Sequence, residues 1–347
     1  MWKRAYIIAD NKLAENAGWD MEILQAEIVA ISGIDMDFDL TITGFEVAEI
    51  DNLLSGSKED DPQDQVQEPP TVPVSRLGDL WHLGDHLLLC ADATQKQSYG
   101  KLLQSRRARA VFTDPPYNVK INGHVCGNGQ TRHDEFKMAS GEMSEAEFAA
   151  FLKSVFQNLA DYSVDGSLHY ICMDWRHIRE LMSAGEVYDD FKNLCVWNKT
   201  NGGMGTLYRS KHELVFVYKH GTKPHINNIE LGKHGRYRTN VWDYAGVNTF
   251  QNTQDLRLHP TVKPVAMVED AILDCTRRND VVLDVFGGSG STLIAAERCH
   301  RRACLMELDP KYVDVIIRRY QGITKKEVRH EDGLSFEEKG VQRHGKS

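Results

Sequence analysis

The strongest constraint on the fold is an alternation of short apolar runs with amphipathic segments, which extends from Leu77 to Tyr320. The apolar runs predict buried strands, and the amphipathic segments have the residue spacing of a helix face. We expect strands at 87–90, 108–113, 168–172, 194–197, 213–219, 281–285 and 303–308, and helices at 148–159, 265–276, 291–298 and 311–320. This alternation predicts an α/β domain whose mainly parallel sheet is covered on both faces.

The remainder of the chain divides into three further segments. Residues 1–54 predict a small helical unit, with an amphipathic helix at 21–31 and a second short helix at 44–54. Residues 55–76 are acidic, rich in proline and almost without apolar residues, which predicts a linker. The polar residues 322–347 predict a frayed tail.

Charge is unevenly distributed, and the formal net charge of −9 conceals this. Residues 1–70 contain 4 Lys and Arg against 16 Asp and Glu, which gives −12, and the remaining 37 basic and 34 acidic residues give +3. Within 196–265 there are 10 basic and 4 acidic residues. This stretch is basic enough to bind the phosphates of a nucleic acid, although an ordinary solvated surface has the same signature.

The composition also bears on compartment and metals. No apolar run approaches the ~18 residues of a membrane span, and the N-terminal residues lack the apolar core of a signal peptide. We therefore expect a cytoplasmic protein with no membrane partner. The seven cysteines include no Cys-x-x-Cys pair, so we expect buried thiols rather than a zinc site or disulfides. His124, Cys126, His133 and Asp134 fit no standard metal site, so we expect no bound metal.

A glycine-rich loop joins the strand at 281–285 to the helix at 291–298. Its residues are Asp284, Val285, Phe286, Gly287, Gly288, Ser289, Gly290, Ser291 and Thr292. Glycines at such a turn let the backbone approach a ligand closely. Glu307 ends the next strand, where an acid can bind both ribose hydroxyls of a nucleoside cofactor. A nicotinamide-binding fingerprint would need a third glycine at the position of Leu293, so we favour another nucleoside cofactor.

The tetrapeptide Asp114-Pro115-Pro116-Tyr117 directly follows the strand at 108–113. Its prolines make the turn rigid, and its simplest interpretation is a stiff turn with Tyr117 packed beneath it. Its functional interpretation is methyl transfer to an amino group, whose ring-conjugated nitrogen is a poor nucleophile until its N–H groups are bound by acceptors. Asp114 and the carbonyl of Pro115 can be those acceptors, and Tyr117 offers a ring on which an extruded base stacks. No Pro-Cys pair is present, so a cytosine-C5 nucleophile is not expected.

These two motifs resemble those of the DNA amino-methyltransferases, the N6-adenine and N4-cytosine family. The catalytic motif precedes the cofactor motif, an order similar to that of the circularly permuted β class. The resemblance covers about 77–321 and implies a Rossmann-like, seven-stranded S-adenosylmethionine-dependent methyltransferase sheet. The two motif strands would then be neighbours whose carboxyl ends share one crevice.

The resemblance also implies which residues bind the cofactor, S-adenosyl-L-methionine. Asp92 would contact the cofactor adenine. The stretch 259–264 resembles the family's His-Pro-x-x-Lys-Pro motif, which opens a helix beside the methionine end of the cofactor, although a helix simply started by proline looks similar. The full set expected at the cofactor is Asp92, Asp114, His259, Thr261, Lys263, Asp284, Phe286, Gly287, Gly288, Gly290, Ser291, Thr292 and Glu307.

The expected substrate is double-stranded DNA. Within the family, Asp rather than Ser at position 114 favours adenine N6, while cytosine N4 remains open because both reactions need the same acceptors. The resemblance places the target-recognition region near 220–256, inside the basic stretch. Residues 118–141 are interpreted either as a flap over DNA or as a plain surface loop.

The N-terminal segment has a resemblance of its own. Residues 9–13, 18–20 and 40–45 are similar to the C-terminal part of a ParB-like nuclease domain, which is fused to such methylases in phage and prophage genomes. The upstream half of that domain is missing, so we expect a truncated segment that packs or bridges subunits rather than a nuclease.

Two other functions remain open from the sequence. An RNA or protein amide methyltransferase uses related tetrapeptides, and a DNA-binding regulatory factor would carry an inactive methylase. The sequence also leaves open a homodimer and a partner restriction endonuclease.

Overall fold

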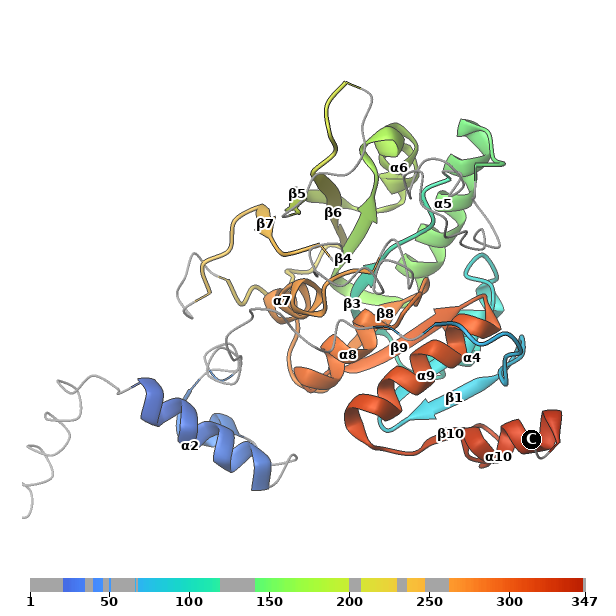
Figure 1. Cartoon of the computed structure of the whole chain (residues 1–347). Helices are drawn as coiled ribbons and strands as arrows, with labels where there is room; N and C mark the ends of the chain where they lie inside the picture. Colours follow the sequence, from blue (N-terminus) through green and yellow to red (C-terminus); the bar gives the residue numbers. More distant parts are fainter. Residues whose placement is uncertain are drawn as a thin grey trace, which may run out of the picture.

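One mixed sheet dominates the structure, a computed structural model that describes residues 21–34, 40–45, 50, 66, 68–118, 141–199, 207–229, 236–246 and 262–345. Within them, ten strands lie in the order β10-β1-β2-β9-β8-β3-β4-β6-β5-β7 (Figure 1). The strands are β1 (Leu80–Leu83), β2 (His86–Cys90), β3 (Ala108–Thr113), β4 (Ser163–Met173), β5 (Asp190–Asn198), β6 (His212–His220), β7 (Val241–Asp243), β8 (Val281–Asp284), β9 (Arg302–Glu307) and β10 (Val328–His330).

Helices cover both faces of this sheet, as the alternation predicted. The helices are α2 (Met21–Ile34), η1 (Leu40–Thr43), α4 (Lys96–Leu103), α5 (Glu145–Asp161), η3 (Trp175–His177), α6 (Ile178–Ala184), η4 (Gly185–Val187), α7 (Val265–Cys275), α8 (Ser291–Arg298), α9 (Pro310–Thr324) and α10 (Phe336–His344). Apolar residues of α4, α5 and α6 form one buried cluster with the sheet, and those of α7, α8 and α9 form the other. A capping box formed by Ser144 and Glu147 begins α5.

The centre of the sheet is parallel and places the two motif strands side by side. β2, β9, β8, β3 and β4 all run in one direction. β3 pairs with β8 through Ala110 with Val282 and Val111 with Leu283, which confirms that the two motif strands are neighbours. β6 lies antiparallel between β4 and β5, so its first residues reach the edge at which the parallel strands end.

The expected seven-stranded sheet is present and is wider than expected. The seven strands from β2 to β5 in the sheet order form its centre. β1 and β10 extend one side through antiparallel pairs, and β7 extends the other side by pairing with β5. These three strands have only 3 or 4 residues each, too short for a periodic signal in the sequence.

The prediction of a frayed C-terminal tail is wrong. β10 pairs with β1, and α10 begins with a capping box formed by Ser335 and Glu338. Trp81, which is fully buried, contacts the rings of His330 and Phe336. A few apolar residues in a polar stretch are therefore enough to dock this segment on the sheet edge.

The N-terminal unit has its own small core. α2 confirms the helix predicted at 21–31, and its Leu24 and Ile28 pack with Ile50 apart from the two main clusters. Figure 1 shows α2 set apart from the sheet. Most of the second predicted helix and of the predicted linker lies outside the described residues. The end of that linker is packed, because the backbone N–H groups of Val74 and Ser75 donate to Asp314 of α9.

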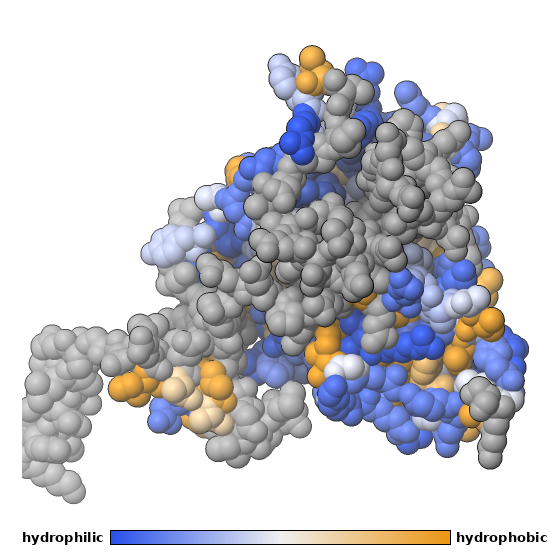
Figure 2. Space-filling view, viewed as in Figure 1, coloured by the Kyte–Doolittle hydropathy of each residue, from blue (hydrophilic) through white to orange (hydrophobic). Residues whose placement is uncertain are grey.

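The described surface and the cysteines are consistent with a globular domain. Among the residues that Figure 2 colours, most on this face are hydrophilic, with scattered apolar side chains between them. Six cysteines are buried free thiols, as expected, and Cys126 lies outside the described residues. Among the described residues, no helix is both long and apolar enough to span a membrane.

Candidate active site

Three strand ends bring the two sequence motifs to one edge of the sheet. β3 ends immediately before Asp114, β8 ends at Asp284, and β9 ends at Glu307. These strands are parallel neighbours, so their carboxyl ends meet at the same edge, where ligands bind in open α/β sheets. The edge therefore holds the tetrapeptide, the glycine-rich loop and the acid predicted at the cofactor ribose.

Asp114 lies at the centre of a charged cluster. The hydroxyl of Tyr117 donates to Asp114 Oδ1 at 2.5 Å, and Lys263 Nζ donates to Asp114 Oδ2. The same ammonium also lies 3.2 Å from the Tyr117 hydroxyl. The structure thus brings Lys263, from the stretch 259–264, to two residues of the tetrapeptide, and it pairs the Lys263 ammonium with the carboxylate of Asp114.

Sequence reasoning missed two charged members of this cluster. Glu213 Oε2 lies 3.1 Å from Lys263 Nζ, and Glu213 Oε1 pairs with Lys199. Glu213 reaches the site because β6 is antiparallel and begins at this edge. A charged residue at the start of a buried apolar strand was the available signal, but the direction of the strand cannot be predicted from that residue alone.

The charges of this cluster shift its pKa values. Burial raises the pKa of Asp114, and nearby Glu213 raises it further against the opposing effect of Lys263. Burial also acts to raise the pKa of Glu213, but Lys263 and Lys199 outweigh it and lower that pKa to about 2. Burial disfavours the ammonium of Lys263, yet Asp114 and Glu213 raise its pKa overall. Lys263 and Glu213 therefore remain charged at neutral pH.

The glycine-rich loop has a backbone that a ligand can approach closely. Gly288 and Gly290 have φ values of +50° and +83°, which disfavour any side chain. A Cβ at Gly290 would lie 3.1 Å from Ile316, whereas one at Gly288 would meet nothing nearer than 3.9 Å. The loop is thus packed against α9 on one side and open at Gly288 on the other.

Glu307 joins this loop to the neighbouring strand. Its Oε2 accepts the N–H of Gly288 at 2.9 Å, and its Oε1 accepts the N–H of Asp309 at 2.8 Å. Burial raises its pKa to about 7 despite these donors. Asp92 follows β2, which pairs beside β9, and its Oδ1 accepts from Thr94. The two predicted cofactor acids therefore follow adjacent strands.

Asp284 ties the loop to the catalytic strand. Its Oδ1 accepts from the Thr113 hydroxyl at 2.9 Å, and its Oδ2 accepts from the Thr292 hydroxyl at 2.6 Å. The N–H of Phe286 donates to Oδ1 as well. Burial raises the pKa of Asp284 to about 7. Because Thr113 precedes Asp114 directly, this bond fixes the end of β3 against the end of β8.

The remaining predicted residues have varied surroundings. The Ser291 hydroxyl lies 3.4 Å from Arg319 Nη1, which also donates to the Ser289 carbonyl, so Ser291 takes part in anchoring the loop to α9. Pro115 is buried and Pro116 is partly exposed. His259 and Thr261 lie outside the described residues. Within the described ranges, no group of three His, Cys, Asp or Glu side chains is placed to hold a metal ion.

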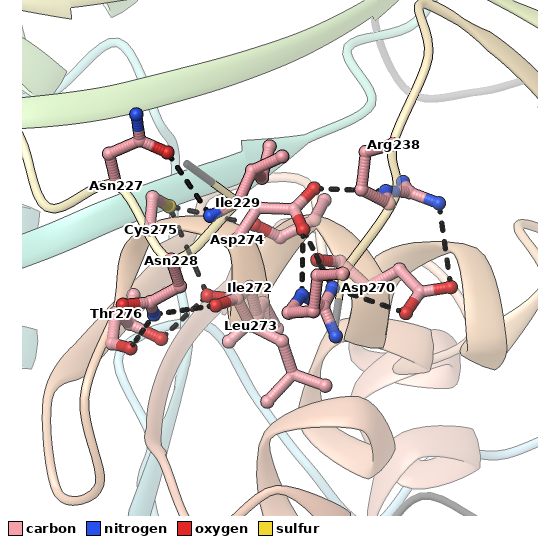
Figure 3. A network of polar contacts seen from close by, with 12 residues as sticks. Asn227, Asn228, Ile229, Arg238, Asp270, Ile272, Leu273, Asp274, Cys275 and Thr276 are labelled. Carbon is pink, nitrogen blue, oxygen red and sulfur yellow. Dashed lines mark hydrogen bonds and ion pairs between the residues drawn. The ribbon is translucent and has the colours of Figure 1, made fainter. Parts of the chain in front are cut away.

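The described part of 220–256 is anchored to α7, the helix that begins beside Lys263. Arg236 and Arg238 both donate to Asp274, at 2.6 Å and 3.1 Å. Figure 3 shows the Arg238 contacts, and it also shows the Asn228 side chain, which donates to the carbonyls of Leu273 and Thr276. A buried ionic and polar network therefore joins this basic region to α7, the helix that begins two residues after Lys263.

Comparisons with known proteins agree with this geometry. A family model described as DNA methylase matches residues 108–318, and one described as ParB-methyltransferase HTH domain matches residues 22–77. The second match overlaps the N-terminal unit, and it extends through the stretch 55–76 that we expected to be a linker.

Individual relatives match over most of their length. The type II methyltransferase M2.MboI of Moraxella bovis is 26% identical over 62% of this chain and 81% of its own length. M2.DpnII of Streptococcus pneumoniae is 28% identical over 61% of this chain and 81% of its own length. The solved PvuII DNA methyltransferase, described as cytosine-N4-specific, is similar in fold, with a TM-score of 0.50 and 15% identity over 73% of this chain and 89% of that one.

Proposed function

This chain belongs to the DNA methylase family, and we propose that it transfers a methyl group from S-adenosyl-L-methionine to N6 of an adenine in a specific sequence of double-stranded DNA. The observation that carries this proposal is the position of Asp114, at the end of β3 and directly beside the glycine-rich loop that follows β8. A carboxylate that binds an amino group is thus adjacent to a loop suited to a nucleoside cofactor.

The residues at the sheet edge fit the proposed cofactor. The open side of the loop at Gly288 leaves room for a ligand against the backbone, and Glu307 offers a partly buried carboxylate at that loop. A carboxylate can accept about four hydrogen bonds, and two backbone donors leave capacity for the ribose hydroxyls. Asp92 would lie on the far side of Glu307, toward the cofactor adenine. When bound, the cofactor supplies a methyl group on a positively charged sulfur.

The tetrapeptide would prepare the amino group. A base extruded from the duplex stacks on the Tyr117 ring, while Asp114 and the Pro115 carbonyl accept its two N–H bonds. This draws the nitrogen lone pair out of conjugation and aims it at the methyl carbon. The cofactor would supply the methyl group to this nitrogen, the electron pair of the broken S–C bond would stay on sulfur, and the proton lost by the nitrogen would pass to Asp114, which accepts that N–H. No covalent bond to the protein is needed.

Adenine is favoured over cytosine by the residue at position 114. Asp stands there, and the resemblance associates Asp with adenine N6 and Ser with cytosine N4. The basic stretch 196–265 includes the end of β5, all of β6 and the segment anchored on α7. Its positive charge suits the phosphates of a nucleic acid, so it supports DNA rather than protein as the substrate.

The proposal is tested by the chemical identity of the product. Duplex DNA is incubated with the purified protein and the cofactor, digested to nucleosides and analysed by mass spectrometry. We expect N6-methyldeoxyadenosine at a defined sequence. N4-methyldeoxycytidine would contradict the choice of base, and methylation of RNA or protein without methylation of DNA would contradict the proposed substrate.

A further inference from the structure

A second buried carboxylate stands behind the catalytic one. Glu213 is only 9% exposed and belongs to neither of the two sequence motifs. The ammonium of Lys263 lies between the two acids, bonded to Asp114 Oδ2 and 3.1 Å from Glu213 Oε2. The Tyr117 hydroxyl is shared in the same way, at 2.5 Å from Asp114 Oδ1 and 3.2 Å from Glu213 Oε2.

This arrangement conflicts with the proposed role of Asp114. Both of its oxygens already accept a hydrogen bond, one of them from a cation. A carboxylate can accept more than two hydrogen bonds. The amino group of a base nevertheless binds an ion-paired carboxylate more weakly than a free one, because the Lys263 ammonium offsets the negative charge that strengthens such a bond. Asp114 can bind the amino group well only after the ammonium has moved away.

Glu213 offers the ammonium another position inside the protein. Moving Lys263 into water would leave Asp114 without a cation and Glu213 with Lys199 alone, and removing one partner from a largely buried ionic cluster is costly. Turning toward Glu213 keeps the ammonium paired, because Oε2 of Glu213 is already within reach. Lys199 holds the other oxygen of Glu213, and it fixes that carboxylate in place. Two acids and two ammonium groups also leave the cluster neutral in either arrangement.

We propose that Glu213 is a positioning residue for methyl transfer. Its carboxylate binds the Lys263 ammonium when the target amino group displaces that ammonium from Asp114. This inference rests on the proposed function and adds a residue to it. Glu213 does not touch the base or the cofactor in this account, and it acts through Lys263.

The test compares single-turnover methyl transfer by the wild type and by Glu213→Gln at saturating cofactor. The amide cannot offset the ammonium charge, so Lys263 stays on Asp114 and we expect the rate to fall at least thirtyfold, with cofactor affinity changed less than threefold. Glu213→Asp should recover part of the rate. Glu180→Gln is the matched control, because Glu180 is also a buried acid, 8% exposed, but it pairs with His177 away from the cluster. It should keep the wild-type rate.

A double variant separates this role from a merely structural one. Adding Lys263→Met to Glu213→Gln removes the cation that competes for Asp114 and returns the net charge of the cluster to zero, so we expect the double variant to be about tenfold faster than Glu213→Gln alone. An unchanged rate in Glu213→Gln, or a double variant slower than that single variant, overturns the inference. A wild-type protein that transfers no methyl group contradicts the proposed function itself, and this inference with it.

Discussion

At the scale of single residues, Tyr117 combines a ring and a hydroxyl with separable roles. Tyr117→Phe keeps the ring and loses the bonds to Asp114 and Glu213, so we expect methyl transfer to slow about tenfold, as for one bond to a charged group. Tyr117→Ala also loses base stacking, worth ~1–3 kcal/mol, and should be slower by a further factor of about 5 to 100. Single-turnover rates with saturating cofactor measure both. Equal rates for the two variants would exclude a stacking role for the ring.

The carboxyl of Glu307 predicts a proton linkage to cofactor binding. Its pKa is raised to about 7 by burial, and ribose hydroxyls would donate to its charged form. Binding therefore lowers this pKa, releases up to about half a proton at pH 7, and becomes tighter as pH rises from 6 to 8. Calorimetry in buffers of different ionisation enthalpy counts the protons.

Glu307→Gln is the control for this linkage. The amide cannot titrate, so proton release should disappear even where weakened binding is still measurable. Asp284 also has a pKa of about 7, but its oxygens are bonded to Thr113 and Thr292, and it should contribute little. The same proton release in the variant would show that another group is responsible.

At the scale of elements, α7 links the basic region to the active site. All of its residues are buried, and its Asp274 pairs with both Arg236 and Arg238. Breaking a buried ionic cluster leaves unpaired charge, so Asp274→Asn should lower the free energy of unfolding by about 3 kcal/mol. Urea unfolding measures this difference.

A surface pair provides the comparison for that prediction. Asp190 and Lys192 pair at 3.1 Å with side chains 44% and 36% exposed. Asp190→Asn should therefore cost less than about 1 kcal/mol. Similar losses in the two variants would mean that the α7 network does not stabilise the fold as we describe.

The elements also show what the sequence can and cannot predict. Strands such as β3 and β8 were predictable because their apolar runs end at recognisable motifs. β1, β7 and β10 were missed because strands of 3 or 4 residues are too short to show an alternation of apolar and polar side chains. Their pairing also depends on the strands beside them. Glu213 was missed for a related reason, since only the antiparallel placement of β6 brings it to Asp114.

At the scale of the whole molecule, the uneven charge of the chain follows its organisation. The acidic N-terminal residues include the match to a helix-turn-helix domain, and the basic stretch lies in the methylase region. The motif order predicted a permuted methyltransferase sheet correctly. The two motif strands, β3 and β8, must be neighbours for their motifs to meet, and this requirement fixes the strand order at the centre of the sheet. The docking of α10 was not predictable, because it depends on the edge formed by β1.

The central claim is that Asp114 binds the amino group that receives the methyl group. The most direct measurement is transfer of a tritiated methyl group to duplex DNA by the wild type and by Asp114→Ala, with the fold of each checked by circular dichroism. We expect the wild type to label DNA and the variant to be slower by a factor of about 10²–10³, as when a positioned acceptor or donor is removed from an active site. A folded Asp114→Ala variant that labels DNA at the wild-type rate would contradict the account.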